Sequence, residues 1–388
     1  MFKPNAQTKS CLWQVIVIGA GPAGSTLAYE LAKRSIEVAV LEKQTFPRYK
    51  CCAGGVSVGA GRLLGVDVQG LAEDTITEAG ISFGGSKPFR GRCHQPIMHT
   101  VMREKFDHAL AMRAKEAGVV VLEGYEVTGI APCAGWVEVS TSGGDFRAQY
   151  VVGADGARSR VARQLSLPTN REWLIAVQSE VQAKEDDMAS LRSQVVLDLG
   201  WGKGGYAWVF PKLDHLSVGM ACFNSMAKDL KQRHRDFMAS LNLRGEVRRR
   251  DAALLPVLSG DPTVYRGRVV LVGDAAGLVD PLTGEGIYNA AWSAQLAADA
   301  IAEAVAEGSH DLGIYQRAVD KHMAPELRAA RLLSRVLVRF PSLAFGMLMR
   351  DERIWRGCCL LLRREISYTT IMQRLGGLRG LCALLFAK

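Results

Sequence analysis

The sequence predicts an α/β fold, and three stretches carry that prediction. Residues 15–42 run from an apolar strand through a glycine-rich turn and a helix to a second strand. Residues 171–261 contain short runs of strand-like alternation, which is typical of an antiparallel sheet. Residues 311–388 contain helical patterns rich in Arg and Leu. We therefore expect a Rossmann-type domain, an antiparallel-sheet domain and a helical C-terminal region.

Composition limits the class of protein. The 388 residues are 48% hydrophobic and 22% charged, which suits a globular chain with more than one domain. No run reaches the roughly 18 apolar residues of a membrane-spanning helix, and we expect no signal peptide. The nine Cys are scattered, without a CxxC pair or zinc spacing. We therefore expect no metal site, no secreted disulfide framework and a cytoplasmic location in a reducing compartment.

The first element is a strand followed by a tight turn. Val15 to Ile18 is apolar, the letters GAGPAG follow, and a helix comes next. In such a turn the glycines allow a bend, a close approach to pyrophosphate and tight packing of helix on strand. A second strand ends in an acid that can bind ribose hydroxyls. A glycine-rich turn without a ligand is the alternative. The pattern predicts a dinucleotide site formed by Gly19, Gly21, Ala23, Gly24, Glu42 and Lys43.

Two later segments have the same strand-first organisation. VVGADGARSRVAR begins at Val151, and VVLVGDAAGLVDPLTGEGIYNA begins at Val269. The second segment leads into a helix that we expect to start near Ile287. Taken alone, Asp274 could be a helix N-cap. That interpretation does not account for three such segments in one chain.

The three segments together resemble the glutathione-reductase-like FAD family, in its p-hydroxybenzoate-hydroxylase-like branch. The resemblance implies a non-covalent FAD whose ribityl or ribose hydroxyls bind Asp274. It also implies that the helix after Gly286 faces the flavin and its phosphates, and that the backbone of Val127 meets adenine. The other FAD-contacting residues that it implies are Arg103, Asp155, Gly156, Gly273, Gly284 and Ile287. No second GxGxxG follows a later strand, so we expect a transient electron donor, either NADPH or reduced ferredoxin.

The loop after the second strand reads RYKCCAGGVS. It resembles the K-x-C-G-G-G-V loop of the geranylgeranyl reductase family. Lys50, Cys52, Gly54 and Gly55 match this motif, and Ala53 stands where the family has the first of three glycines. By this resemblance Cys52, Ala53 and Gly54 border the flavin.

Two further segments resemble the same family. GGYAWVFPK is similar to its YxWxFPK strand, and EISYTTIMQRLG at residues 365–376 is similar to its C-terminal S-Y segment. Alternation along a strand places Tyr206, Trp208 and Phe210 on one face. An aromatic face suits a long apolar substrate laid beside a flavin.

The resemblance implies a flavin-dependent reduction of alkenes. Hydride addition to one carbon requires a proton at the other, and the Cys52 thiol can supply or gate it. We therefore expect Cys52, Tyr206 and Trp208 to be catalytic. Cys51 is expected to be a packing residue that points the other way, since neighbouring side chains alternate in an extended chain. Packing is also the alternative role for Cys52.

Positive charge is concentrated near the C-terminus. The net charge is +9, and residues 325–388 hold twelve Lys or Arg against four Asp or Glu. Arg328, Arg331, Arg335 and Arg339 share one predicted helical face, opposite Leu332, Leu333, Val336, Leu337 and Phe340. The pattern indicates peripheral contact with an anionic inner membrane face or a phosphorylated substrate. A solvated face is the alternative, and no recognition motif suggests nucleic acid.

These expectations combine into one organisation and one function. We assign residues 1–170 and 262–310 to an FAD-binding domain, 171–261 to an antiparallel-sheet substrate domain and 311–388 to a basic helical region. The expected function is FAD-dependent reduction of carbon–carbon double bonds in the geranylgeranyl or prenyl chain of an isoprenoid lipid. The alternatives are an FAD-dependent monooxygenase or halogenase acting on an aromatic substrate, and a flavin-containing lipid carrier without turnover.

Overall fold

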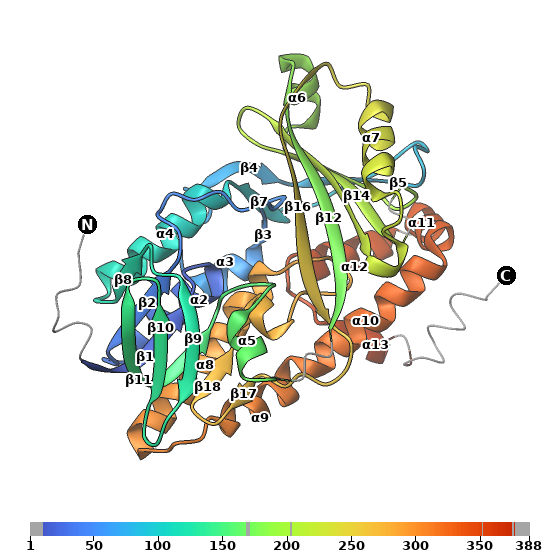
Figure 1. Ribbon diagram of the computed structural model, residues 1–388. Helices are drawn as coiled ribbons and strands as arrows, with labels where there is room; N and C mark the ends of the chain where they lie inside the picture. The colour runs from blue at the N-terminus through green and yellow to red at the C-terminus, as the bar shows by residue number, and fades with distance from the viewer. Residues whose placement is uncertain (1–10, 168–170, 202–203, 351, 375, 377–388) are drawn as a thin grey trace.

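The computed structural model describes residues 11–167, 171–201, 204–350, 352–374 and 376. Within these residues the strands form three sheets. In Figure 1 an eight-stranded sheet with its helices fills the lower left, and a seven-stranded sheet rises at the top. The C-terminal helices lie at the lower right, beneath the seven-stranded sheet. None of the described helices is long and apolar enough to cross a membrane.

The eight-stranded sheet has a parallel centre. Its central strands are buried along most of their length, as expected of strands covered on both faces. An antiparallel pair of strands extends from one side. The strands in spatial order are β17 (Tyr265–Arg266), β18 (Val269–Leu271), β11 (Gly144–Gly153), β1 (Leu12–Ile18), β2 (Val38–Glu42) and β8 (Val120–Glu123), with β10 (Val137–Thr141) and β9 (Val127–Pro132) branching from β11.

The helix predicted after the glycine-rich turn forms and packs on this sheet. A Cβ on Gly24 would lie 1.9 Å from the Gly19 carbonyl oxygen, so the helix can begin this close to the strand only with glycine there. The predicted helix start at Ile287 is confirmed. The helices of this region are α2 (Pro22–Ala32), α4 (Arg103–Glu116), α5 (Arg160–Gln164), α8 (Ile287–Glu307) and α9 (Gly313–His322).

The seven-stranded sheet is mostly antiparallel. The runs of strand-like alternation between residues 173 and 223 all form strands, and a long strand at 245–258 joins them. These runs are WLIAVQSEV, SQVVLDL, YAWVF and LSVGMACF. Two further strands come from residues 78–92, a stretch that the sequence analysis placed in the 1–170 segment. The spatial order is β16 (Gly245–Leu258), β12 (Arg171–Ala183), β15 (Leu216–Phe223), β14 (Gly205–Pro211), β13 (Gln194–Asp198), β5 (Glu78–Ser82) and β6 (Phe89–Arg92).

Small elements connect the two large sheets. A three-stranded sheet holds the chain that follows the cysteine loop. Its strands are β3 (Gly55–Ser57), β7 (Met98–Val101) and β4 (Ala72–Ile76), and α3 (Val58–Leu64) follows β3. The remaining short helices are α6 (Glu185–Leu191), η1 (Asn224–Met226), α7 (Leu230–Ser240) and η2 (Gly273–Ala276).

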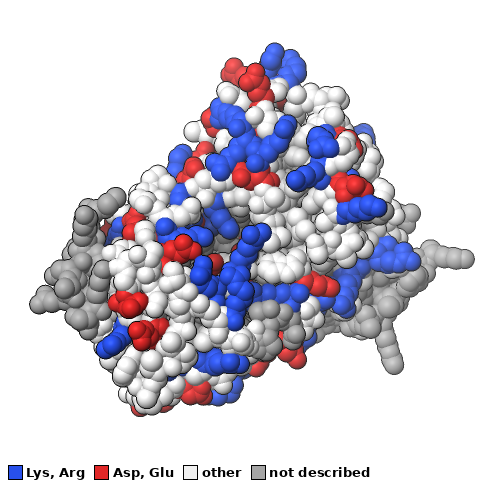
Figure 2. Space-filling view, in the orientation of Figure 1, with Lys and Arg blue, Asp and Glu red and all other residues white. Residues whose placement is uncertain are grey.

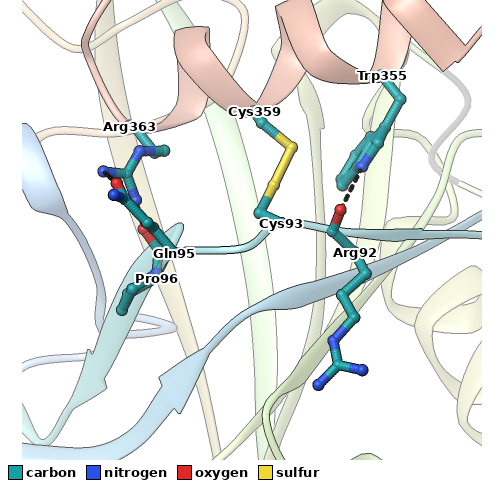
Figure 3. Close-up of a disulfide and its surroundings, with 7 residues drawn as sticks. All are labelled: Arg92, Cys93, Gln95, Pro96, Trp355, Cys359 and Arg363. Atoms are coloured by element: carbon teal, nitrogen blue, oxygen red, sulfur yellow. Dashed lines mark hydrogen bonds between the residues drawn. A yellow bond between two sulfur atoms is a disulfide. The ribbon is translucent and has the colours of Figure 1, made fainter.

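Four helices form the end of the described chain, and one of them is fastened to the loop between β6 and β7. They are α10 (Ala324–Arg339), α11 (Pro341–Arg350), α12 (Glu352–Leu362) and α13 (Tyr368–Arg374). Figure 3 shows Cys359 of α12 in a disulfide with Cys93, and the Trp355 indole Nε1 donating to the Arg92 carbonyl oxygen at 3.2 Å. The Arg363 side chain donates to Gln95 Oε1 at 2.7 Å. The sequence argues against a disulfide framework, and it does not reveal this pair, whose cysteines lie 266 positions apart.

Candidate active site

One cavity of about 1120 Å³ is lined by both large sheets and the C-terminal helices. Gly24 and Gly273 are absent from its wall, and a Cβ on Gly273 would lie 3.1 Å from Ala23 Cβ, so this glycine allows close packing. The remaining site residues predicted from the sequence all line this cavity: Gly19, Gly21, Ala23, Glu42, Lys43, Cys52, Ala53, Gly54, Arg103, Val127, Asp155, Gly156, Tyr206, Trp208, Asp274, Gly284, Gly286 and Ile287.

The turn between β1 and α2 forms the nucleotide end of the cavity. Gly19 has φ +100°, and a Cβ there would lie 2.5 Å from the Ala154 carbonyl oxygen. A Cβ on Gly21 would meet nothing closer than 3.9 Å, so the backbone is open toward the cavity. The carboxylate of Glu42 is buried and accepts the backbone N–H groups of Ala20 at 2.9 Å and Gln44 at 3.0 Å. These contacts hold the Glu42 side chain in place at the end of β2.

A buried ion cluster that the sequence analysis missed lies beside Glu42. The fully buried carboxylate of Asp107 binds Arg103 Nε at 2.7 Å and Arg48 at 3.0 Å. Arg48 also lies 3.5 Å from Glu42. Burial acts to lower the pKa of Arg103, but the Asp107 carboxylate and the Cys52 side chain outweigh it and raise that pKa. Arg103 therefore remains a cation on the cavity wall. The i,i+4 spacing of Arg103 and Asp107 was the available sequence signal.

Asp274, which belongs to the segment that begins at Val269, lies where α8 begins. A Cβ on Gly286 would lie 3.1 Å from Asp274 Oδ1, so the carboxylate is next to the start of the helix. Burial raises the pKa of Asp274, while the positive charges of Lys50, Arg103 and Arg171 oppose the rise. No hydrogen bond to the Asp274 carboxylate comes from the described residues. The carboxylate is available to a ligand.

Asp155 has a partly structural role. Its Oδ2 accepts the backbone N–H of Arg160 at 2.6 Å and that of Val161 at 3.2 Å, which caps α5. Its Oδ1 is buried and has no hydrogen-bond partner among the described residues. One oxygen therefore holds the helix, and the other is free to meet a donor group in the cavity.

The donors and acceptors at this end fit FAD. Both α2 and α8 begin on the cavity wall without a side-chain cap, so the N–H groups of the first turn of α8, and those that follow Pro22 in α2, are free of one. Helix N-termini bind phosphate through such N–H groups. Glu42, Asp274 and the unpaired oxygen of Asp155 supply acceptors for hydroxyl groups. Phosphates and sugar hydroxyls are the polar parts of a dinucleotide cofactor.

The cysteine loop lies where the nucleotide end meets an apolar chamber. Gly54 has φ +74°, whereas Ala53 is absent from the described residues with positive φ. Alanine therefore stands in place of the family glycine without backbone strain. Cys52 Sγ accepts the Gly54 N–H at 3.3 Å. Cys51 also lies on the cavity wall, so the expected alternation does not remove it from the site, and burial raises the pKa of its thiol to about 12.

The aromatic side chains of β14 form one wall of the chamber. Tyr206, Trp208 and Phe210 all line the cavity, as the alternation predicts. Trp208 covers Gly219, where a Cβ would lie 2.3 Å from the indole ring. The Tyr206 hydroxyl donates to the Thr283 carbonyl oxygen, and burial raises the pKa of this phenol, so it stays protonated. Aliphatic side chains of the neighbouring strands continue this wall: Ile81, Leu174, Ala176, Leu197, Leu199, Ala221, Ala253, Leu254 and Leu255.

Comparisons with known proteins identify the family. Residues 13–199 match the protein-family model described as FAD binding domain. The chloroplastic geranylgeranyl diphosphate reductase of Nicotiana tabacum is 32% identical, over 84% of this chain and 75% of that protein. Digeranylgeranylglycerophospholipid reductase 2 of Methanothermobacter thermautotrophicus is 32% identical, over 77% of this chain and 80% of that protein. The chain belongs to the geranylgeranyl reductase family. It is an FAD-dependent oxidoreductase that acts on carbon–carbon double bonds.

Solved structures agree on the fold. The geranylgeranyl bacteriochlorophyll reductase-like protein of Thermoplasma acidophilum has a TM-score of 0.79 and 22% identity, and the match covers 94% of this chain and 98% of that one. The flavin-dependent brominase Bmp2 has a TM-score of 0.74 and 20% identity, covering 91% and 94%. These identities show a shared fold and do not separate the two activities.

In this geranylgeranyl reductase family member, the C-terminal helices roof the apolar chamber. Leu333, Val336 and Leu337, which lie on the predicted apolar face of α10, line the cavity. On its basic face Arg328 pairs with Asp261 at 2.7 Å and Arg331 pairs with Glu172 at 2.8 Å. The basic run predicted beyond Arg374 lies outside the described residues, apart from Gly376. The roof residues are Leu333, Val336, Leu337, Met347, Ile354, Trp355, Cys358, Leu361, Leu362 and Ile371.

The segment that resembles the family's S-Y motif, together with Arg364 just before it, holds this roof to the loop before α8 at the nucleotide end of the cavity. Arg364 lies 2.8 Å from Asp280 and 2.6 Å from Glu285. Tyr368 donates its hydroxyl to Asp280 at 2.7 Å, and the Ser57 hydroxyl donates to Glu285 at 2.7 Å. The Arg364 guanidinium also lies 4.6 Å from the centre of the Tyr288 ring. The network joins α13, the loop before α8 and the end of β3.

Proposed function

We propose that this protein saturates carbon–carbon double bonds in the prenyl chain of an isoprenoid lipid. The observation that carries the proposal is the continuity of one cavity. Its polar end fits FAD, and its other end is an apolar chamber roofed by helices. The relatives named as geranylgeranyl diphosphate reductase and digeranylgeranylglycerophospholipid reductase act on substrates with such chains. An apolar enclosure of this kind favours a flexible hydrocarbon chain through burial of its surface.

The residues of the nucleotide end would hold the cofactor. The free N–H groups at the start of α2 and α8 would bind phosphate and flavin, and Glu42 and Asp274 would bind hydroxyl groups. The backbone of Val127 and the cation Arg103 stand on the same wall. Reduced FAD supplies a hydride when it is bound.

The protein would supply the second hydrogen. Saturation of one double bond adds a hydride to one carbon and a proton to the other. Cys52 lies between the polar end and the chamber, and its S–H is the proton source in our proposal. The thiolate left behind regains a proton from solvent. Tyr206 and Trp208 would hold the chain against the flavin, and the apolar roof would exclude water.

The mouth of the cavity is basic. Lys43, Lys50, Arg158 and Arg163 are exposed residues on its rim. Figure 2 shows Lys and Arg side chains gathered near the centre of the face in view. A cluster of one sign raises the local concentration of oppositely charged partners. This favours an anionic electron donor, and NADPH and reduced ferredoxin both meet that requirement.

Exposed Arg335 and Arg339 support a peripheral contact with anionic membrane as part of this proposal. They stand on α10, whose opposite face lines the chamber, so such a contact would bring the substrate chamber near its lipid source.

An anaerobic assay tests the reductase. The protein with reduced FAD is incubated with a panel of prenyl lipids, and mass spectrometry follows gains of two hydrogens per double bond. Reoxidation of the flavin by a prenyl lipid without oxygen is the expected result. Reoxidation only by oxygen, with a hydroxylated or halogenated aromatic product, would support the rival activity. A flavin that is reoxidised neither by a prenyl lipid nor with turnover of an aromatic substrate would support a carrier.

A further inference from the structure

A buried lysine stands behind the cysteine loop, outside the cavity wall. Lys212 directly follows β14 and is only 1% exposed. Its Nζ donates to the Ala53 carbonyl oxygen at 2.6 Å and to the Val101 carbonyl oxygen at 2.9 Å. It forms no ion pair with a carboxylate among the described residues. Burying an ammonium group without a counter-ion is costly, so a contribution to stability does not explain its presence.

The lysine completes a set of contacts that holds three successive carbonyl groups of the loop. The Cys52 carbonyl oxygen accepts from Gln178 Nε2 at 3.4 Å. The Ala53 carbonyl oxygen accepts from Lys212, and the Gly54 carbonyl oxygen accepts from the Val101 N–H at 2.8 Å. With all three directions set, the backbone between Cys52 and Gly55 has little freedom.

The absence of a side chain at Gly54 leaves room for this lysine. A Cβ there would lie 2.5 Å from Lys212 Nζ and 2.1 Å from the Val101 carbonyl oxygen. The left-handed Gly54 then points its N–H at Cys52 Sγ. The Lys212 ammonium group therefore lies next to Gly54, and Gly54 in turn donates a hydrogen bond to the Cys52 thiol.

We propose that Lys212 is a positioning residue for the cysteine loop: its Nζ ties Ala53 to Val101 so that the Cys52 thiol faces the cavity, and it places a positive charge close to that thiol. This rests on the proposed function only where Cys52 acts as the proton source. An opposite charge nearby stabilises a thiolate and raises its reactivity. Arg103 is the second cation beside Cys52: Asp107 accepts from its Nε and Nη2, and the Cys52 side chain is a further hydrogen-bond partner of Arg103.

The charge of Lys212 is itself sensitive to pH. Burial lowers the pKa of Lys212 to about 8, against the opposing influence of Cys52, Glu180 and Glu73. Glu180 is joined in turn to His215 at 3.1 Å, and His215 to Asp214 at 2.7 Å. Lys212 is therefore charged at neutral pH and loses its charge as the pH rises through about 8.

The test measures the reactivity of the Cys52 thiol directly. Full-length protein with bound FAD, in a Cys51→Ser background, is alkylated with iodoacetamide, and mass spectrometry measures the rate at the peptide carrying Cys52. Lys212→Met should slow this alkylation at neutral pH by about 10-fold or more. The difference from the parent should shrink above about pH 9, where Lys212 is uncharged in the parent too. The matched control is Lys105→Met, which removes an exposed lysine bound to Glu73 and should leave the rate unchanged.

Two further measurements separate the possible outcomes. In the prenyl assay, Lys212→Met should lower kcat more than it raises KM, with FAD occupancy retained. Alkylation that slows in a protein without reductase activity would uphold Lys212 and reject the proposed function. If Lys212→Met does not fold, Lys212→Gln, which keeps an N–H donor without the charge, replaces it. Alkylation of Cys52 at the parent rate in the folded variant would overturn the proposal.

Discussion

The guanidinium of Arg364 lies 2.8 Å from the carboxylate of Asp280, and this contact joins the C-terminal helices to the loop that precedes α8. Both side chains are buried, at 9% and 1% exposure. The roof of the apolar chamber is therefore held to the flavin end by charge as well as by apolar packing.

Arg364→Met should destabilise the protein strongly. It leaves the buried Asp280 and the partly buried Glu285 as carboxylates without their cation, a change that for a buried pair typically costs about 3–5 kcal/mol. Denaturant unfolding measures the loss, and limited proteolysis should cut the C-terminal helices first. Arg356→Met, which removes an exposed cation from α12, is the control and should change stability by less than about 0.5 kcal/mol. Equal losses in both variants would contradict the role given to Arg364.

The purified protein should be yellow and hold FAD without a covalent bond. Asp274→Ala should weaken FAD binding by about 1.5–3 kcal/mol, because a hydrogen bond to a charged group is lost. Absorbance of the flavin after dialysis measures the occupancy. Asp299→Ala, which changes an exposed carboxylate on α8, should leave it unchanged. A colourless wild-type protein that does not take up FAD would reject the site.

Cys52→Ser should slow the reoxidation of the flavin by substrate without slowing the reduction of the flavin by the donor. It retains a side chain of similar shape but removes the easily ionised thiol. FAD binding and reduction by the donor should stay nearly intact, while reoxidation by prenyl substrate slows by about 10²–10⁴-fold. Stopped-flow absorbance of the flavin follows both steps, and Cys51→Ser should change little. If Cys51→Ser is the damaging variant, the assignment of Cys52 is wrong.

The Cys93–Cys359 disulfide should stabilise the roof. Reduction of the wild type should lower the free energy of unfolding by about 2–5 kcal/mol, because the bridge closes a long loop. Cys359→Ser should show the same loss without a reductant and no further loss with one. Cys133→Ser changes a free cysteine and should behave like the wild type. Unfolding of the wild type that is insensitive to reductant would show that the bridge does not contribute.

Association with lipid should depend on the two exposed arginines of α10. The wild type should bind anionic vesicles more than neutral ones, and salt near 1 M should release it, since the Debye length falls to ~3 Å. The double change Arg335→Gln and Arg339→Gln should weaken binding more than Arg328→Gln, because Asp261 already neutralises Arg328. Cosedimentation measures all three. Equal binding to neutral vesicles would favour a solvated face.

Local patterns in the sequence determined the elements of the nucleotide end. The glycines around Gly21 predict the turn between β1 and α2, because only glycine allows the close backbone contacts found there. The run before Ile287 predicts where α8 begins, and alternation predicts that Tyr206 and Trp208 share a wall. Turn chemistry and strand period are properties of neighbouring residues, so a single sequence carries them.

Only the tertiary structure decided which segments meet. It placed apolar side chains of α10 over the chamber, added β5 and β6 to the seven-stranded sheet and paired Cys93 with Cys359. It also set Lys212 behind the loop of Cys52. A helical pattern shows that one face is apolar, but it does not show which element packs on that face. In the same way, the sequence around a lysine or a cysteine does not identify a partner far along the chain. Those partners follow from the packing of whole elements, where buried surface and paired polar groups select one arrangement.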